Sequence, residues 1–191
     1  MSFQSGTQTE VQYSVASQST ELNTFTAEDN LQKTYPPWTG IQPGFFTRAT
    51  PYATCLKYKA SGQIGGTATP TFLFSLRLMA NTQSWAATGL LLGATAAQAI
   101  TGTLVRCPWF ADIDVFVRSP GLGANTTVVT TGEIRSPIFA LPVTMPSLAV
   151  SPAVATLDSS STYYPFLSVA CGTSNSLNLI NMQTLKVYGE N

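Results

Sequence analysis

The amino-acid sequence predicts an all-β protein: an eight-stranded β-sandwich of the jelly-roll type, preceded by an extended N-terminal arm. Segment after segment alternates apolar and polar residues with a period of two, which marks strands with one buried face. Helix signals are nearly absent, and Ser and Thr make up roughly a quarter of the chain, as sheet surfaces and turns favour. At 191 residues the chain suits one domain, residues 45–191, with an arm, residues 1–44.

The alternation is clearest in two of the predicted strands. Residues 55–60 place Leu56 and Tyr58 on one face and two lysines on the other. Residues 109–118 place apolar side chains, from Trp109 to Val117, on one face and two aspartates on the other. The same pattern predicts further strands at 71–79, 89–93, 126–133, 163–171 and 177–188.

The first 44 residues differ from the rest of the chain. The first thirty carry acidic residues and no Lys or Arg, and only 11–15 alternate as a short strand would. Residues 35–44 contain three prolines and two glycines, which prevent a helix and favour an extended path. Tyr35 and Trp38 lie among these prolines, and exposed aromatic residues usually have a surface to cover. We therefore expect the arm to lie on a surface, with a mobile tail as the alternative.

Residues 136–152 interrupt the alternation. They are apolar but contain four prolines, so they are not expected to form a central strand. An apolar, irregular connection of this length should not be exposed to water. It either covers an open end of its own sandwich or packs on a neighbouring subunit, and the zero net charge of the chain favours the neighbouring subunit.

The composition excludes several functional classes. Charged residues make up 9% of the chain, against roughly 25% in an average soluble domain, and nine cations balance nine anions. Electrostatic repulsion between molecules with such a surface is weak and does little to prevent their association. The composition therefore suits a protein that stays bound to others. Without histidine the chain has no Ser-His-Asp triad and no His-ligated metal site. It also lacks the basic stripe of a nucleic-acid binder and the long apolar run of a membrane helix.

Few candidates for chemistry remain. Cys55, Cys107 and Cys171 are odd in number and far apart, so we expect free thiols and no metal pattern. Asp112 and Asp114 share a strand face about 7 Å apart, as a glycosidase or a calcium site would in principle require, but surface charges account for them more simply. No base is available to activate a serine, and no signal peptide is visible. The sequence thus predicts no enzymatic activity, no cofactor and synthesis in a cytoplasm.

Several stretches of the chain resemble one protein family. The arm contains FTAE at 25–28 and YPP followed by GFF at 35–46, and a predicted strand reads ATPTFLFSLRL at 68–78. The chain ends with ACGTSN at 170–175 and NLINMQTLKVYGEN at 178–191. These motifs resemble those of small virion proteins from tailed phages, especially phages of actinobacteria, and the resemblance covers most of the chain.

This resemblance implies a tumour-necrosis-factor-like jelly roll that assembles as a homotrimer. The function that it implies first is a capsid decoration protein, bound to the major capsid protein on the outer surface of the phage head and stabilising it. The alternative is a minor tail or fibre-tip protein that binds a receptor or a carbohydrate, with Trp85 and Trp109 stacking on sugar rings. Neither reading involves a nucleic acid, a membrane or a cofactor.

Two sets of residues are expected to make the contacts. Burial of aromatic side chains supplies binding energy, at about 25 cal/mol per Å² before the costs of association, and buried charge at a three-fold axis would be costly. The arm residues expected to bind the capsid or another partner are Phe25, Tyr35, Pro36, Pro37, Trp38, Phe45 and Phe46. The residues expected at the trimer interface are Phe110, Phe116, Phe139, Leu141, Met145, Tyr164 and Phe166.

Overall fold

The computed structural model describes residues 9–47, 54–67, 70–83, 89–100, 104–139, 147–152 and 154–190. Within these ranges the chain is built from strands, together with one short 3-10 helix, η1 (Phe45–Thr47). The strands are β1 (Thr9–Val15), β2 (Asp29–Asn30), β3 (Cys55–Gly66), β4 (Thr71–Ala80), β5 (Leu90–Thr95), β6 (Gln98–Ala99), β7 (Leu104–Ser119), β8 (Thr126–Arg135), β9 (Ser147–Pro152), β10 (Val154–Leu157), β11 (Tyr163–Cys171) and β12 (Leu179–Glu190).

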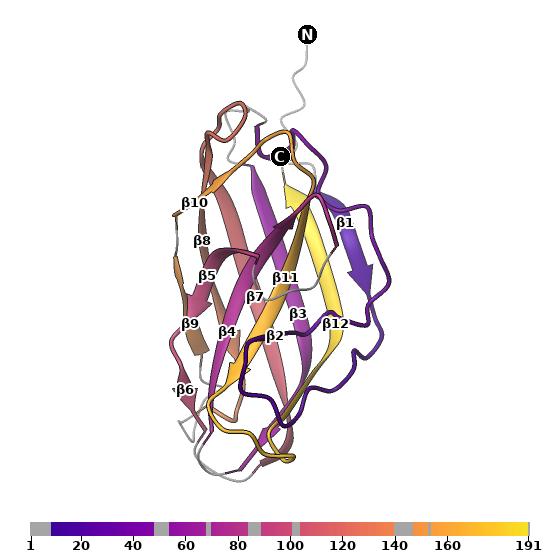
Figure 1. Ribbon diagram of the computed structural model, residues 1–191, viewed down its shortest axis with the longest axis vertical. Coiled ribbons are helices and arrows are strands. Elements are labelled where there is room, and N and C mark those ends of the chain that lie inside the picture. The colour runs from indigo at the N-terminus through magenta and orange to yellow at the C-terminus, as the bar shows by residue number, and fades with distance from the viewer. Residues whose placement is uncertain are drawn as a thin grey trace.

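The strands form two antiparallel sheets that face each other (Figure 1). Sheet A has the order β1-β12-β3-β7-β8, and sheet B has the order β5-β4-β11-β2. Strand β9 pairs with β8 at one end and with β5 at the other, so it joins the two sheets. The long strands pair in a nested way, β3 with β12, β4 with β11, β5 with β9 and β7 with β8, as in an antiparallel ribbon folded over on itself. The all-β sandwich predicted from the sequence is thereby confirmed.

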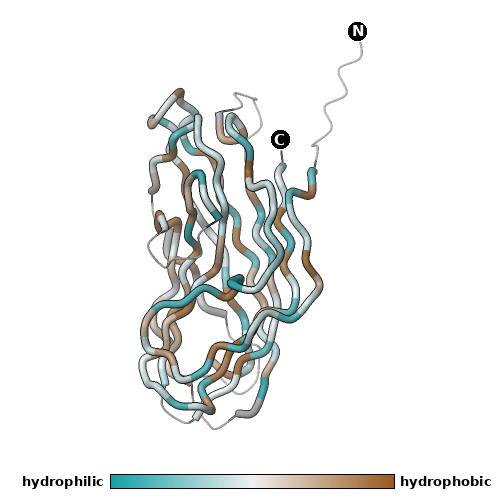
Figure 2. Tube along the Cα trace, turned by 45° about the vertical axis from the view of Figure 1, so that its right-hand side comes forward, coloured by the Kyte–Doolittle hydropathy of each residue, from teal (hydrophilic) through white to brown (hydrophobic). Residues whose placement is uncertain are grey.

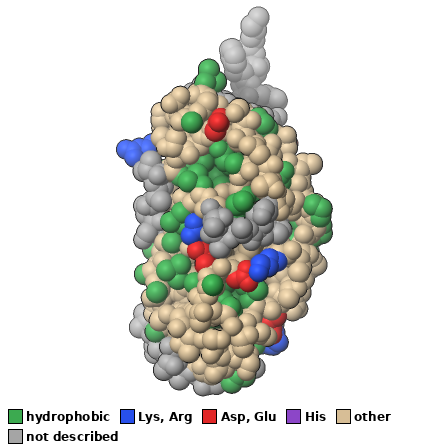
Figure 3. All heavy atoms as spheres, in the orientation of Figure 1, with side chains coloured by type: hydrophobic (Ala, Val, Ile, Leu, Met, Phe, Trp, Pro, Cys, Tyr) green, Lys and Arg blue, Asp and Glu red, His purple; other side chains and the backbone are tan. Residues whose placement is uncertain are grey.

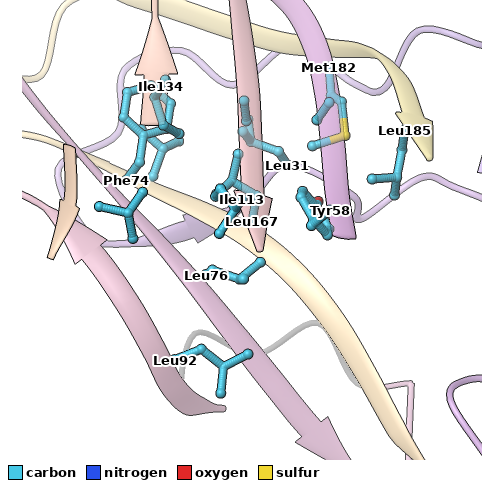
Figure 4. Close-up of a cluster of buried hydrophobic side chains, with 14 of the residues drawn as sticks. Leu31, Tyr58, Phe74, Leu76, Leu92, Ile113, Ile134, Leu167, Met182 and Leu185 are labelled. Atoms are coloured by element: carbon cyan, nitrogen blue, oxygen red, sulfur yellow. The ribbon is translucent and has the colours of Figure 1, made fainter. Parts of the chain in front are cut away.

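The core lies between the two sheets and follows from the period-two pattern. In β7 the odd-numbered residues from Trp109 to Val115 are buried, and the aspartates between them point outward. Sheet B contributes Phe74 and Leu76 from the opposite side (Figure 4). The rings of Phe74 and Trp109 lie 6.0 Å apart across the core. The predicted inward faces of these strands are therefore correct.

The N-terminal segment belongs to the same sandwich. We call residues 16–44, which connect β1 to η1 and include β2, the strap. Its backbone bonds first to the edge of sheet A, from Leu22 N to Ile180 O at 2.8 Å, and then to the edge of sheet B, from Leu31 N to Leu167 O at 3.0 Å. The strap thus crosses the open side of the sandwich (Figures 1 and 2). The predicted arm therefore lies on a surface, and over residues 9–44 this surface belongs to its own chain.

The proline-rich segment also closes its own sandwich where the structure describes it. Ile138 and Phe139 are buried in the core, with Phe139 lying 6.3 Å from Phe74. Residues 147–152 form β9, which corrects the prediction of an irregular connection there. The two prolines at 142 and 146 lie outside the described residues. Among the described residues no helix is long and apolar enough to cross a membrane.

Candidate functional site

The two outer faces of the sandwich differ in chemistry. On sheet A the outward residues of β12, β3, β7 and β8 stand side by side in rows. One row contains Lys186, Lys59, Asp112 and Glu133, because each residue is the register partner of the next. The neighbouring row on one side contains Tyr188, Lys57, Asp114 and Thr131, and the row on the other side contains Thr184, Ser61, Phe110 and Arg135.

Ion pairs connect many of these charges. Lys59 Nζ lies 3.0 Å from Asp112 Oδ2 on the neighbouring strand, and Lys57 Nζ lies 3.4 Å from Glu190 Oε2. Burial raises the pKa of Asp114, an effect that the nearby Lys57 partly offsets. Asp114 in turn raises the pKa of Lys57. These charges are surface groups of a half-exposed sheet, as the sequence predicted for the aspartates.

The charges of this face are only partly separated by sign. Three lysines lie on β12 and β3, and Asp112, Asp114 and Glu133 lie on β7 and β8. Each half also carries the opposite charge, because Glu190 on β12 pairs with Lys57 and Arg135 on β8 pairs with Glu133 at 3.0 Å. Lys186 is therefore the direct neighbour of Lys59, and Asp112 is the direct neighbour of Glu133. Like charges directly opposite each other destabilise a sheet. We call this arrangement the divided face.

The divided face also carries a hollow and an exposed aromatic ring. Residues from all four strands line a hollow of about 350 Å³, among them Ser61, Phe110, Thr184 and Lys186. Phe110 is 41% exposed. A second hollow of about 300 Å³ adjoins it and shares Lys59 and Tyr188 with the first. The surface is thus concave and offers charged, aromatic and hydroxyl groups.

The outer face of sheet B is poor in charge. Its half-buried or exposed residues include Leu73 and Met79 on β4, Leu91 on β5 and Tyr164 on β11. Figure 3 views the molecule from this side, where hydrophobic side chains are scattered over the surface and few charges appear. Such a face resembles the centre of a protein–protein interface, where charged residues are depleted.

The strap neutralises a cation on this face. Glu28 of the strap receives two hydrogen bonds from the guanidinium of Arg77 on β4, at 2.6 and 2.8 Å, and a third from the Ser168 hydroxyl on β11. Arg77 also donates to the carbonyl of Gly89 at 2.8 Å. Burial raises the pKa of Glu28, but the hydrogen bonds and the charge of Arg77 lower it by more, so that the pKa lies below its usual value.

Three of the arm residues expected to bind a partner are core residues of their own chain. Tyr35, Phe45 and Phe46 are buried, which corrects the expectation that they present a binding surface. Tyr35 lies in the strap, and Phe45 and Phe46 lie in η1, which directly follows the strap. Phe25 and Trp38 are half-buried against that core, and the two prolines of the YPP motif, Pro36 and Pro37, are exposed.

The residues expected at the trimer interface divide in the same way. Phe139 and Phe166 are buried in their own chain, so their assignment to an interface is corrected. Phe110, Phe116 and Tyr164 remain at least partly exposed. Leu141 and Met145 lie outside the described residues.

Of the two tryptophans proposed for sugar stacking, one is buried and the other lies outside the described residues. Trp109 is buried and donates its indole N–H to the carbonyl of Asn181 at 2.9 Å, and Trp85 lies outside the described residues. Cys55 and Cys171 are buried free thiols and Cys107 is half-buried. No group of three or more metal-binding side chains occurs among the residues that the structure describes.

Sequence reasoning missed a buried polar residue in the strap. The side-chain oxygen of Gln32 accepts hydrogen bonds from the Tyr58 hydroxyl at 2.6 Å and from the backbone N–H of Leu167 at 3.0 Å. Gln32 is fully buried and links both sheets through the strap. No sequence pattern identifies it, because a single glutamine in a polar stretch looks like a surface residue.

Comparisons with known proteins leave the function open. No protein-family model and no curated protein sequence matches the chain. Among solved structures, the chain is similar to the CBM2 module of the evolved Dit from Lactobacillus casei BL23 phage J-1, with a TM-score of 0.33 and 11% sequence identity over 97% of each chain. A TM-score of this size establishes neither a common fold nor a common function.

Proposed function

We propose that the protein is a non-catalytic structural component of a tailed-phage particle, a homotrimer that binds the major capsid protein on the outer surface of the head. Its resemblance to small phage virion proteins supports this function, and so does its low charge. A protein bound at many sites of an assembled shell stabilises that shell by mass action, because it binds the assembled state alone.

The observation that carries the proposal is the charge-poor outer face of sheet B. Leu91 is 37% exposed there, beside the half-buried Leu73, Met79 and Tyr164. The cation in the middle of the face, Arg77, is already paired with Glu28 of the strap. Covering this face would therefore remove water from few charged groups and cost little free energy of desolvation. For this reason we assign the trimer contact to it.

Light scattering on Leu91→Asp tests this assignment. The introduced carboxylate would be buried without a partner at the contact, so the variant should lose the three-copy assembly. Leu122→Asp is the matched control, because Leu122 is 82% exposed in the loop between β7 and β8 and should tolerate the same change. A wild-type protein whose mass is not a multiple of three chains would contradict the trimer. An unchanged assembly in Leu91→Asp would contradict the assigned face.

A minor tail or fibre-tip protein that binds a receptor or a carbohydrate is the second candidate function. An aromatic cluster favours it: the rings of Tyr13 and Trp38 lie 4.7 Å apart, and Tyr164 lies 6.0 Å from Trp38. All three are half-buried, and the indole N–H of Trp38 has no hydrogen-bond partner among the described residues. A glycan array probed with the wild type and with Trp38→Ala tests this function. Binding that Trp38→Ala abolishes would favour it, and an array without binding would remove it.

A further inference from the structure

The hollow of about 350 Å³ on the divided face has no role in the proposed trimer contact, which lies on sheet B. Its lining residues come from β12, β3, β7 and β8, so the register of four hydrogen-bonded strands fixes its shape. Ligand pockets begin at about 300 Å³ and combine aromatic side chains with a few polar groups. The hollow lies at the lower end of this range and rests on a rigid sheet.

One row of the hollow combines two hydroxyl groups with an exposed aromatic ring. Thr184, Ser61 and Phe110 are successive register partners on β12, β3 and β7. The hydroxyl oxygens of Ser61 and Thr184 lie 2.6 Å apart and share one hydrogen bond. Because each hydroxyl has one proton and two lone pairs, the pair can still donate one hydrogen bond and accept others. The ring of Phe110 stands beside them and is 41% exposed.

The charges that line the hollow favour an anionic group. The lining contains three cations and one carboxylate. Lys59 is paired with Asp112 at 3.0 Å, and Arg135 is paired with Glu133 at the same distance. The third cation, Lys186, is exposed and forms no ion pair within the described part of the chain. Lys186 is thus the cation whose charge is left for a ligand.

We propose that this hollow binds an acidic saccharide, which combines a ring, hydroxyl groups and a carboxylate. The C–H groups of the sugar ring lie on the negative face of the Phe110 ring. The sugar hydroxyls exchange hydrogen bonds with Ser61 and Thr184, and the carboxylate pairs with Lys186. This site is separate from the proposed trimer contact and from the aromatic cluster around Trp38, and it depends on neither.

The spacing of these groups suits a short saccharide. Strands in a sheet are about 4.8 Å apart, and alternate residues of one strand are about 7 Å apart. Phe110 and Thr184 therefore lie about 10 Å from each other across the row, with Lys186 about 7 Å further along β12. The adjoining hollow of about 300 Å³ shares Lys59 and Tyr188 with the first. A saccharide chain can therefore extend from one hollow into the other.

The aromatic ring and the paired hydroxyls distinguish this ligand from other anions. A phosphate ion would pair with Lys186 but would leave Phe110 uncovered. An acidic peptide would also pair with Lys186, but it offers no ring of hydroxyl groups to Ser61 and Thr184. Only the saccharide uses all of these groups together.

A microarray of saccharides that carry a carboxylate, together with the methyl esters of the same saccharides, tests the site. Isothermal titration calorimetry on the best-bound saccharide then gives the affinity. The wild type should bind the acid about tenfold more tightly than its ester, because the ester has no charge for Lys186. Lys186→Gln should weaken binding of the acid by a similar factor and leave binding of the ester unchanged. Phe110→Ala should weaken binding of both, whereas Phe110→Tyr keeps the ring and should retain it.

Two variants are matched controls. Lys33→Gln removes one lysine charge from the strap, outside the hollow, and should leave the affinity unchanged. Leu122→Ala removes an exposed apolar side chain elsewhere and should also leave it unchanged. Circular dichroism checks that every variant folds. Leu91→Asp should bind the saccharide as tightly per chain as the wild type does, which keeps a failure of this site distinct from a failure of the trimer assignment.

Weaker binding in Phe110→Ala and in Lys186→Gln, with unchanged binding in Lys33→Gln, would support the proposal. The absence of binding to every acidic saccharide would overturn it. Equal binding of a polyglutamate peptide would also overturn it, because charge alone would then account for the affinity. Binding that Trp38→Ala abolishes and Phe110→Ala leaves unchanged would place the saccharide in the aromatic cluster and would contradict the proposed site.

Discussion

Glu28 and Arg77 lie 49 residues apart in sequence and join the strap to the outer face of sheet B. The ion pair is two-pronged, and both side chains are mostly buried, with 21% and 18% of their surface exposed. Glu28 belongs to the FTAE stretch and Arg77 to the LRL stretch of the sequence. Two motifs that look independent in the sequence therefore form one contact.

Replacing Glu28 by Gln should lower the free energy of unfolding by about 1–2 kcal/mol, because charged hydrogen bonds to Arg77 and Ser168 are lost. The ion pair between Lys33 and Asp29 is the control, because Lys33 is far more exposed. Lys33→Gln should cost less than about 0.5 kcal/mol. Urea denaturation of both variants measures the difference. Equal losses would show that the strap does not depend on the contact between Glu28 and Arg77.

The pH dependence of stability should report the same contact. The pKa of Glu28 is lower in the folded chain than its usual value of 4.5. Its contribution is therefore present above pH 4.5 and is lost as the pH falls through the lower, folded pKa. The stability difference between the wild type and Glu28→Gln should be largest near neutral pH and should shrink in acid. A difference that grows as the pH falls would contradict the lowered pKa.

The buried network around Gln32 should be sensitive to the loss of one partner. Gln32→Leu leaves the Tyr58 hydroxyl buried without an acceptor and should cost about 2–4 kcal/mol. Adding Tyr58→Phe removes that unsatisfied group, so the double variant should lose less than the sum of the two single variants. Denaturation of the three proteins measures this coupling. Strict additivity would mean that the two side chains do not interact.

The three thiols should react in an order set by burial. Burial raises the pKa of Cys55 to about 12 and also raises the pKa of Cys171 and of Cys107. In the folded protein at pH 8 an alkylating reagent should modify the half-buried Cys107 first, and the other two only after denaturant is added. Mass spectrometry of the labelled peptides reads this order. Rapid labelling of Cys55 in the folded chain would contradict its burial.

Much of the sandwich could be predicted because apolar and polar residues alternate along its strands, a pattern that depends only on neighbouring residues in the sequence. Residues 109–118 alternate in the sequence, and Trp109 and Ile113 are buried as that alternation requires. The pairing of β9 with both sheets could not be predicted, because prolines suggested an irregular segment and the partners lie far away in sequence. The burial of Phe166 could not be predicted either, because Phe166 lies on the face of its strand that is opposite to the core.

The strap and the surface sites were harder to predict. Aromatic residues near prolines indicated that residues 35–46 cover a surface, but local sequence does not say whether that surface belongs to the same chain. Tyr35 is buried because the strap crosses the open side of the sandwich, and Phe46 is buried in η1, which directly follows the strap. The divided face depends on register across four strands, and Lys186 and Lys59 become neighbours only once that register is known.

The copy number of the protein in purified phage particles tests the proposed function most directly. Quantitative mass spectrometry against the major capsid and tail-tube proteins gives this number. The proposed decoration of the head predicts a copy number comparable to that of the major capsid protein. A handful of copies in multiples of three would contradict it and place the protein at the tail tip or on a fibre.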